Sequence, residues 1–121
     1  IINQNSPFMV KIDLHIHTIA SISDKSFEFD LEKLREYTEK LEIDCIAITN
    51  HNLFDLKQYQ YICKSLNITV LPGIEIDLEG GHLLLIADNS DINDILDFSN
   101  KCNLVNKSIK SCDDYLTIDQ F

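Results

Sequence analysis

The stretch Asp13–Thr18, DLHIHT, carries two histidines one residue apart in an otherwise apolar run. Apolar and polar residues alternate over residues 9–17, which is typical of a strand with two different faces. The alternation predicts one face made of Val10, Ile12, Leu14 and Ile16, and another made of Lys11, Asp13, His15 and His17. Burying a carboxylate and two imidazoles without partners is costly. The polar face therefore needs water, hydrogen bonds or a metal ion.

The composition is that of one small, acidic, folded domain. The chain has 121 residues, of which 45% are hydrophobic, and a formal net charge of −10. No cluster of basic residues stands out, so we do not expect this segment to bind nucleic acid directly. An acidic chain that acts on anionic substrates would need a cation between them, and the charge is therefore compatible with metal binding.

The cysteines and the apolar runs indicate a cytoplasmic protein. Cys45, Cys63, Cys102 and Cys112 form no C-x-x-C pair and follow no signal peptide, which favours reduced thiols and disfavours a zinc ribbon. No apolar run approaches the roughly 20 residues of a membrane span, so no membrane partner is expected. Because the first residue is Ile, we expect a piece of a longer protein, with a tail over 1–8 and one domain over 9–121.

Strands and helices are predicted to alternate along the chain. The predicted elements are a strand over 9–17, a loop over 18–29, a helix over 31–41 capped by Asp30, a strand over 44–49, a helix over about 55–66 ended by Asn67, a strand over 69–78 broken at Pro72–Gly73, a turn at Gly80–Gly81, a strand over 82–87 and a helix over 91–99. This order is typical of an α/β parallel sheet or barrel. A closed (β/α) barrel needs about 250 residues, so about half of one is present.

Polar residues recur where the predicted strands end. The carboxyl ends of parallel strands gather at one edge, so we expect His15, His17, His51 and Glu75 to share a cleft. Imidazole and carboxylate ligands suit zinc, manganese or iron. Two such ions can hold the attacking water and the leaving oxygen of a phosphate ester. A single strand-end histidine is more often merely hydrogen-bonded, but the pair with His51 and Glu75 favours a metal site.

Other polar residues near the strand ends have simpler interpretations. Asp24 alone could cap a turn, and Asp77 and Glu79 could be solvated hairpin charges, so we leave the latter two out of the site. With a turn at Gly80–Gly81, His82 would lie four residues from Glu75, roughly 13 Å along the strand. Spacing alone therefore argues against a shared ion.

Together, DLHIHT, ITNHN, and PGIEID followed by GGHLLLI resemble the PHP (polymerase and histidinol phosphatase) family over residues 9–88. The resemblance implies a distorted (β/α)7 TIM-like barrel with two or three divalent ions at the strand ends. It also implies these ligands: His15, His17, Asp24, His51, Glu75, which would bridge two ions, and His82. Members include phosphatases, nucleases and domains of bacterial replicative polymerases, and this version is similar to domains joined to an ATPase of the structural-maintenance type.

The chain departs from the family pattern at two points. The usual Asp-His is Asn50-His51 here, and no later histidine or Asp-x-His pair follows His82. We predict a metal-dependent phosphoesterase in which metal-bound hydroxide attacks a phosphomonoester or nucleotide phosphodiester. The partner would be a phosphorylated small molecule or nucleotide, and no general acid is identified.

Two other functions stay open. One is a catalytically incomplete regulatory or structural module attached to an ATPase or polymerase, and the other is an α/β binding domain without metal. The strand edges of a half barrel would also favour a homo-oligomer.

Overall fold

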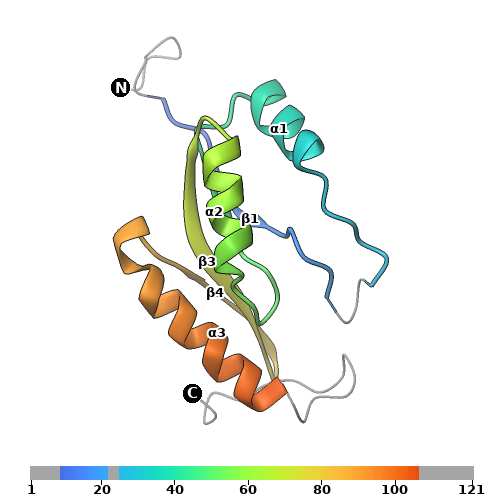
Figure 1. Ribbon diagram of the computed structural model, residues 1–121, viewed down its shortest axis with the longest axis vertical. Coiled ribbons are helices and arrows are strands. Elements are labelled where there is room, and N and C mark those ends of the chain that lie inside the picture. The colour runs from blue at the N-terminus through green and yellow to red at the C-terminus, as the bar shows by residue number, and fades with distance from the viewer. Residues whose placement is uncertain (1–8, 22–24, 107–121) are drawn as a thin grey trace.

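The computed structural model describes residues 9–21 and 25–106. Its elements are β1 (Ile12–Ile16), α1 (Leu31–Lys40), β2 (Cys45–Ile48), α2 (Leu56–Ser65), β3 (Thr69–Leu78), β4 (Gly81–Ile86), the 3-10 turn η1 (Asn89–Asp91) and α3 (Ile92–Asn106). The sheet order is β1-β2-β3-β4, with β1, β2 and β3 parallel and β4 antiparallel to β3. The sheet curls like half of a barrel (Figure 1). The predicted fold class, a partial TIM-like α/β barrel, is confirmed.

Aspartates begin the first two helices. The Asp30 side chain accepts hydrogen bonds from the backbone N–H groups of Glu32 and Lys33 at the start of α1. Asp55 accepts one from Gln58 at the start of α2, at 3.0 Å. Both side chains satisfy N–H groups that a helix start leaves without partners.

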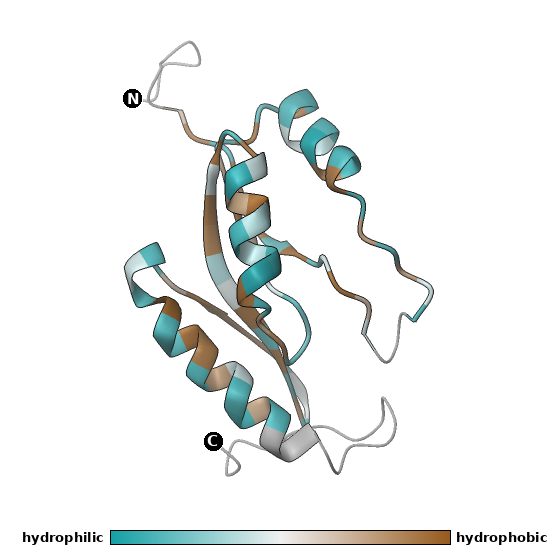
Figure 2. Ribbon diagram, viewed as in Figure 1, coloured by the Kyte–Doolittle hydropathy of each residue, from teal (hydrophilic) through white to brown (hydrophobic). Residues whose placement is uncertain are grey.

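The helices and strands meet in one apolar core. The strands contribute Ile46, Ile48, Val70, Ile74 and Ile76, and the helices contribute Leu34, Tyr59, Ile62, Ile95 and Cys102. Apolar residues run along the strands, whereas the helices carry both kinds of residue (Figure 2). Since right-handed crossovers put α1 and α2 on the same face of the sheet, the opposite face is free to carry polar side chains.

A bulge in β1 corrects the predicted faces of this strand. Asp13 pairs with Ile46 and Ile16 pairs with Ile48, so β1 holds one more residue than β2 over this interval. Because the extra residue reverses the alternation, Asp13 and Ile16 lie on the helix face of the sheet. Tyr37 of α1 donates to Oδ2 of Asp13 at 2.6 Å. Ile12 falls on the opposite face, where it is 57% exposed rather than packed on helices.

The predicted break of the third strand at Pro72–Gly73 is wrong, since β3 continues through these residues and gains β4 as a second neighbour from Gly73 onward. Pro72 pairs with Ile48 of β2, and Gly73 pairs with Ile86 of β4. A Cβ atom on Gly73 would lie 2.9 Å from the carbonyl oxygen of Leu85 and 3.0 Å from that of Ile48. Only a residue without a side chain fits between the two neighbouring backbones.

Two predicted boundaries near the carboxyl end were wrong. The hairpin turn lies at Glu79–Gly80, not Gly80–Gly81, since Leu78 pairs with Gly81. Gly80 has a φ of +88°, in the region that favours glycine. The last helix continues beyond residue 99 because Ile95 and Cys102, two turns apart, are both buried in the core. The predicted tail over residues 1–8 lies outside the described residues.

Candidate metal centre

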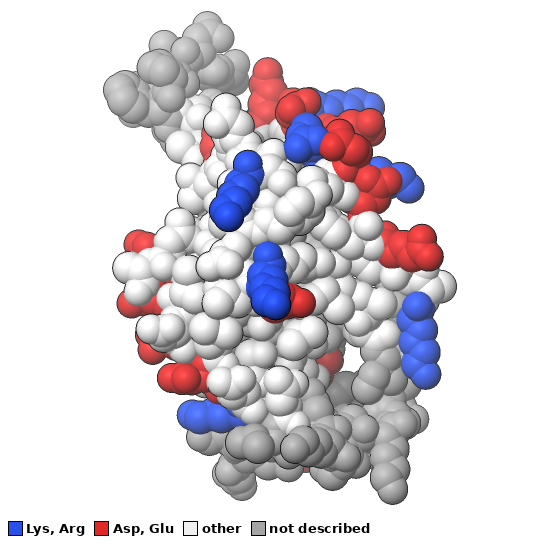
Figure 3. All heavy atoms as spheres, in the orientation of Figure 1, with Lys and Arg blue, Asp and Glu red and all other residues white. Residues whose placement is uncertain are grey.

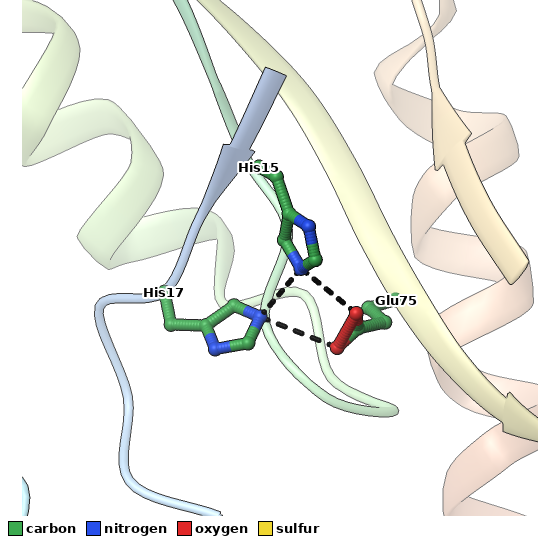
Figure 4. A group of neighbouring side chains, drawn as sticks. All are labelled: His15, His17 and Glu75. Carbon is green, nitrogen blue, oxygen red and sulfur yellow. Dashed lines mark hydrogen bonds and ion pairs between the residues drawn. The ribbon is translucent and has the colours of Figure 1, made fainter. Parts of the chain in front are cut away.

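Six polar side chains converge where the strands end, on the sheet face opposite the helices. They are His15 of β1, His17 and His51 just after β1 and β2, Glu75 and Asp77 of β3, and His82 of β4. Figure 4 shows the imidazoles of His15 and His17 pointing toward the carboxylate of Glu75.

Glu75 is the centre of this cluster and is only 1% exposed. Its Oε1 lies 2.8 Å from Nε2 of His15 and 3.3 Å from Nδ1 of His82. Its Oε2 lies 3.0 Å from Nδ1 of His51 and 3.3 Å from Nε2 of His17. Four imidazoles from three strands thus surround one buried carboxylate.

Backbone hydrogen bonds fix Glu75 against the loop after β2. The N–H of Glu75 donates to the carbonyl of Asn50 at 2.9 Å, and its own carbonyl accepts from Asn52 at 2.8 Å. Asn52 has a φ of +54°, a left-handed conformation that asparagine tolerates. Its side-chain oxygen accepts from the N–H of Asp77 at 2.9 Å. The loop therefore holds His51 level with Glu75 of β3.

The donor atoms fit a divalent cation. Nε2 of His15 and Nε2 of His17 lie 3.2 Å apart, so at most one of them can direct a proton at the other. Burial lowers the pKa of His17, and His51 lowers it further, which favours the neutral imidazole that binds metals. Oε2 of Glu75 is buried and accepts no hydrogen bond from the residues that the structure describes, although two imidazole nitrogens lie close to it.

The spacing between the donors agrees with this chemistry. Ligands bound at about 2.1 Å lie about 3.0 Å apart around an octahedral ion and about 3.4 Å apart around a tetrahedral one. The distances from His15 and His17 to each other and to Glu75 run from 2.8 to 3.3 Å. The donor atoms of two sets lie within 4.8 Å of one another, and Glu75 belongs to both: His15, His17 and Glu75, and His51, Glu75 and Asp77.

His82 lies much closer to Glu75 than the sequence predicted. The predicted distance of roughly 13 Å assumed a turn at Gly80–Gly81, whereas the turn one residue earlier places His82 opposite Asp77. His82 then lies on the face that Glu75 shares, with its Nδ1 3.3 Å from the carboxylate. Asp24, the remaining predicted ligand, lies outside the described residues.

Asp77 is the site residue that the sequence interpretation left out. Its Oδ1 lies 2.9 Å from Nδ1 of His51 and 3.7 Å from Nε2 of His82. The signal was present, because Asp77 follows Glu75 by two residues on one strand and so shares its face. Asp77 was interpreted instead as a solvated charge of the hairpin.

Asn50 connects the ends of β1 and β2 and does not join the cluster. Its Oδ1 accepts from the N–H groups of Thr18 and Ile19 at 2.7 and 2.9 Å, and its Nδ2 donates to the hydroxyl of Thr18 at 3.0 Å. The Thr18 hydroxyl donates to Oε1 of Gln58, whose Nε2 donates to the Thr18 carbonyl. This network fixes the backbone immediately after His17.

Comparison with known families agrees with this geometry. The family model of the PHP domain matches residues 13–115. The chain belongs to the PHP family. This is a family of metal-dependent phosphoesterases, and the match spans all six residues of the cluster. The comparison with curated proteins gave no significant match. Among the described residues of this PHP domain, no helix is both long and apolar enough to cross a membrane.

Proposed function

We propose that this PHP domain binds divalent manganese, zinc or iron at the cluster and hydrolyses a phosphomonoester or a nucleotide phosphodiester. The observation that supports it most is Glu75, a buried carboxylate with four imidazoles within 3.3 Å and one oxygen that accepts no hydrogen bond from the described part of the chain. A carboxylate in that position is costly unless a cation compensates it.

Each side chain has a role in this proposal. His15, His17 and Glu75 hold one ion, and His51, Glu75 and Asp77 hold a second, with His82 completing the cluster. When bound, the ions would neutralise phosphate charge and lower the pKa of a water molecule toward neutrality. Asn52 and Asn50 are positioning residues, because they fix the backbone of Asp77 and the backbone after His17.

The surface charge supports a small substrate over a polynucleotide. On the face drawn in Figure 3, charges gather over α1, where Lys and Arg lie among Asp and Glu rather than in a basic patch. With a net charge of −10, the chain would repel phosphate unless cations intervened. We also propose a cytoplasmic location, since Cys45, Cys63 and Cys102 are free thiols.

Metal content and hydrolysis test the proposal together. The chain is purified without chelator, and manganese, iron and zinc are counted per chain by mass spectrometry. Hydrolysis of p-nitrophenyl phosphate is then followed after chelation and after return of manganese.

We expect at least one ion per chain and manganese-dependent activity. Glu75→Gln should lose both, while Glu79→Gln in the exposed turn should keep both. Full metal content and activity in Glu75→Gln would overturn the proposal.

A second candidate function is a regulatory or structural module that binds metal without hydrolysing phosphate esters. It is favoured by Asn50, which stands where the resemblance expects an aspartate and whose side chain binds the backbone after His17 instead of joining the cluster. The results expected for it are a stoichiometric metal content that is lost in Glu75→Gln, and no hydrolysis of a monoester or diester at any metal concentration.

β1 and β4 are the edge strands of the described sheet, so such a module could pair with a second copy or with a fused domain. Analytical ultracentrifugation distinguishes a dimer from a monomer.

A further inference from the structure

A cavity of about 380 Å³ lies beside the candidate metal centre, between β1, the segment over residues 27–30 and α1. Its volume falls within the range of about 300 to 1,000 Å³ that is typical of small-molecule sites. None of the roles proposed above uses it.

The wall of the cavity is apolar. Ile16, Phe29 and Leu34 line it and also pack with the main core, which holds them in place. Phe27 lines it too, is half-buried and stands outside that core. Two phenyl rings and two aliphatic side chains therefore offer a surface that suits a flat apolar group.

Two residues belong both to the lining of the cavity and to the candidate metal centre. His15 and His17 line the cavity, and the Nε2 atoms of the same imidazoles contact the carboxylate of Glu75. A ligand in the cavity would therefore contact His15 and His17, two of the residues proposed to hold an ion.

The charges around the cavity disfavour an anionic occupant. Glu28 and Asp30 are exposed at its edge, and Lys33 is the one basic residue among its described lining residues. Asp13 adds a third carboxylate, although its oxygens already accept from the N–H of His15 and the hydroxyl of Tyr37. Three carboxylates against one ammonium leave a net negative potential.

We propose that this cavity binds the uncharged aromatic group of a phosphomonoester whose phosphate lies at the metal centre. The site given to the phosphate rests on the proposed function, whereas the site given to the aromatic group rests on the cavity alone. It makes Phe27 a specificity-determining residue, since it contacts the organic part of the substrate and not the reacting atoms.

Two measurements on the full chain test the cavity. The first is binding of naphthol, which carries no phosphate, followed by NMR in the wild type, in Phe27→Ala and in Tyr61→Ala. Tyr61 is a matched control because it is an aromatic residue of α2, 55% exposed and outside the cavity lining. The second is kcat/KM with manganese for naphthyl phosphate and for methyl phosphate. Phe27→Ala should lower kcat/KM for naphthyl phosphate by about tenfold or more, as expected for loss of a buried aromatic contact, and leave methyl phosphate within about twofold.

The outcomes separate this inference from the proposed function. Naphthol that binds the wild type and Tyr61→Ala but not Phe27→Ala supports the cavity even if no ester is hydrolysed. Naphthol that fails to bind, or that binds Phe27→Ala equally well, overturns the cavity whatever the metal content. A naphthol sulfonate should bind more weakly than naphthol because of the carboxylates, and tighter binding would overturn the predicted preference for an uncharged group.

Discussion

Nδ1 of His51 lies 2.9 Å from Oδ1 of Asp77, across the gap between the end of β2 and the end of β3. An ionised carboxylate only accepts hydrogen bonds, so Asp77 either accepts a proton from Nδ1 and leaves Nε2 of His51 to bind metal, or it shares an ion with Nδ1 as a second ligand. A carboxylate that orients an imidazole in this way raises the affinity of that imidazole for metal. Asp77 therefore contributes to the cluster, whether it contacts an ion itself or holds His51.

Replacing Asp77 with asparagine should weaken metal binding and preserve the fold. Asp77→Asn keeps the size of the side chain but removes its charge, and we expect the affinity for manganese or zinc to fall about 10- to 100-fold. Isothermal titration of the chelated chain measures this change. Asp97→Asn, an exposed aspartate of α3, is the matched control and should bind as the wild type does. Equal affinities in the two variants would remove Asp77 from the site.

Elements whose signals are local could be predicted from the sequence. Asp30 and Asp55 each precede a helix and accept backbone N–H groups at its start, so α1 begins where predicted and α2 begins one residue later than predicted. The cluster of His15, His17, His51 and Glu75 also follows from strand order alone, because parallel strands gather their carboxyl ends.

Shifts of a single residue could not be predicted from periodicity. The bulge in β1 turns Asp13 away from His15, and the hairpin turn at Glu79–Gly80 brings His82 level with Asp77. Each shift moves side chains to another face or another level because the period of a strand is two. Both depend on pairing between strands, which a pattern within one strand does not contain.

Substitution of Gly73 should destabilise the chain more than substitution of Gly81. A Cβ at Gly73 would meet backbone oxygens at 2.9 and 3.0 Å, whereas one at Gly81 would meet no atom of the described residues within 4 Å. We expect Gly73→Ala to lower the free energy of unfolding by about 1 to 3 kcal/mol, as for other overpacked sites, and Gly81→Ala to change it by less than about 0.5 kcal/mol. Urea denaturation measures both. Similar midpoints for the two variants would mean that the strands separate at Gly73 at little cost.

Cys102 should resist thiol reagents in the folded chain. It is fully buried in α3, and burial, followed by the charge of Asp77, raises the pKa of its thiol to about 11. At pH 8 the reactive thiolate is then roughly 100-fold less populated than in an ordinary cysteine. Since the raised pKa favours the neutral thiol, labelling should speed up as the pH rises toward 11. Mass spectrometry after iodoacetamide treatment measures labelling at each cysteine. Rapid native labelling of Cys102 at pH 8 would contradict the prediction.

Asn50 should support metal binding through the backbone after His17. Asn50→Ala leaves the buried N–H of Thr18 and the part-buried N–H of Ile19 without their acceptor, which should cost about 2 kcal/mol or more of unfolding free energy. Asn50→Asp keeps a carboxylate oxygen for both N–H groups, so it should restore much of this loss and of the metal affinity. Tyr59→Phe is the matched control, because it removes a buried hydrogen bond to Val70 away from the cluster. If Asn50 positions His17, Asn50→Ala loses both stability and metal affinity, whereas Tyr59→Phe loses stability alone. A fall in metal affinity that simply follows stability across all three variants would leave Asn50 a purely structural role.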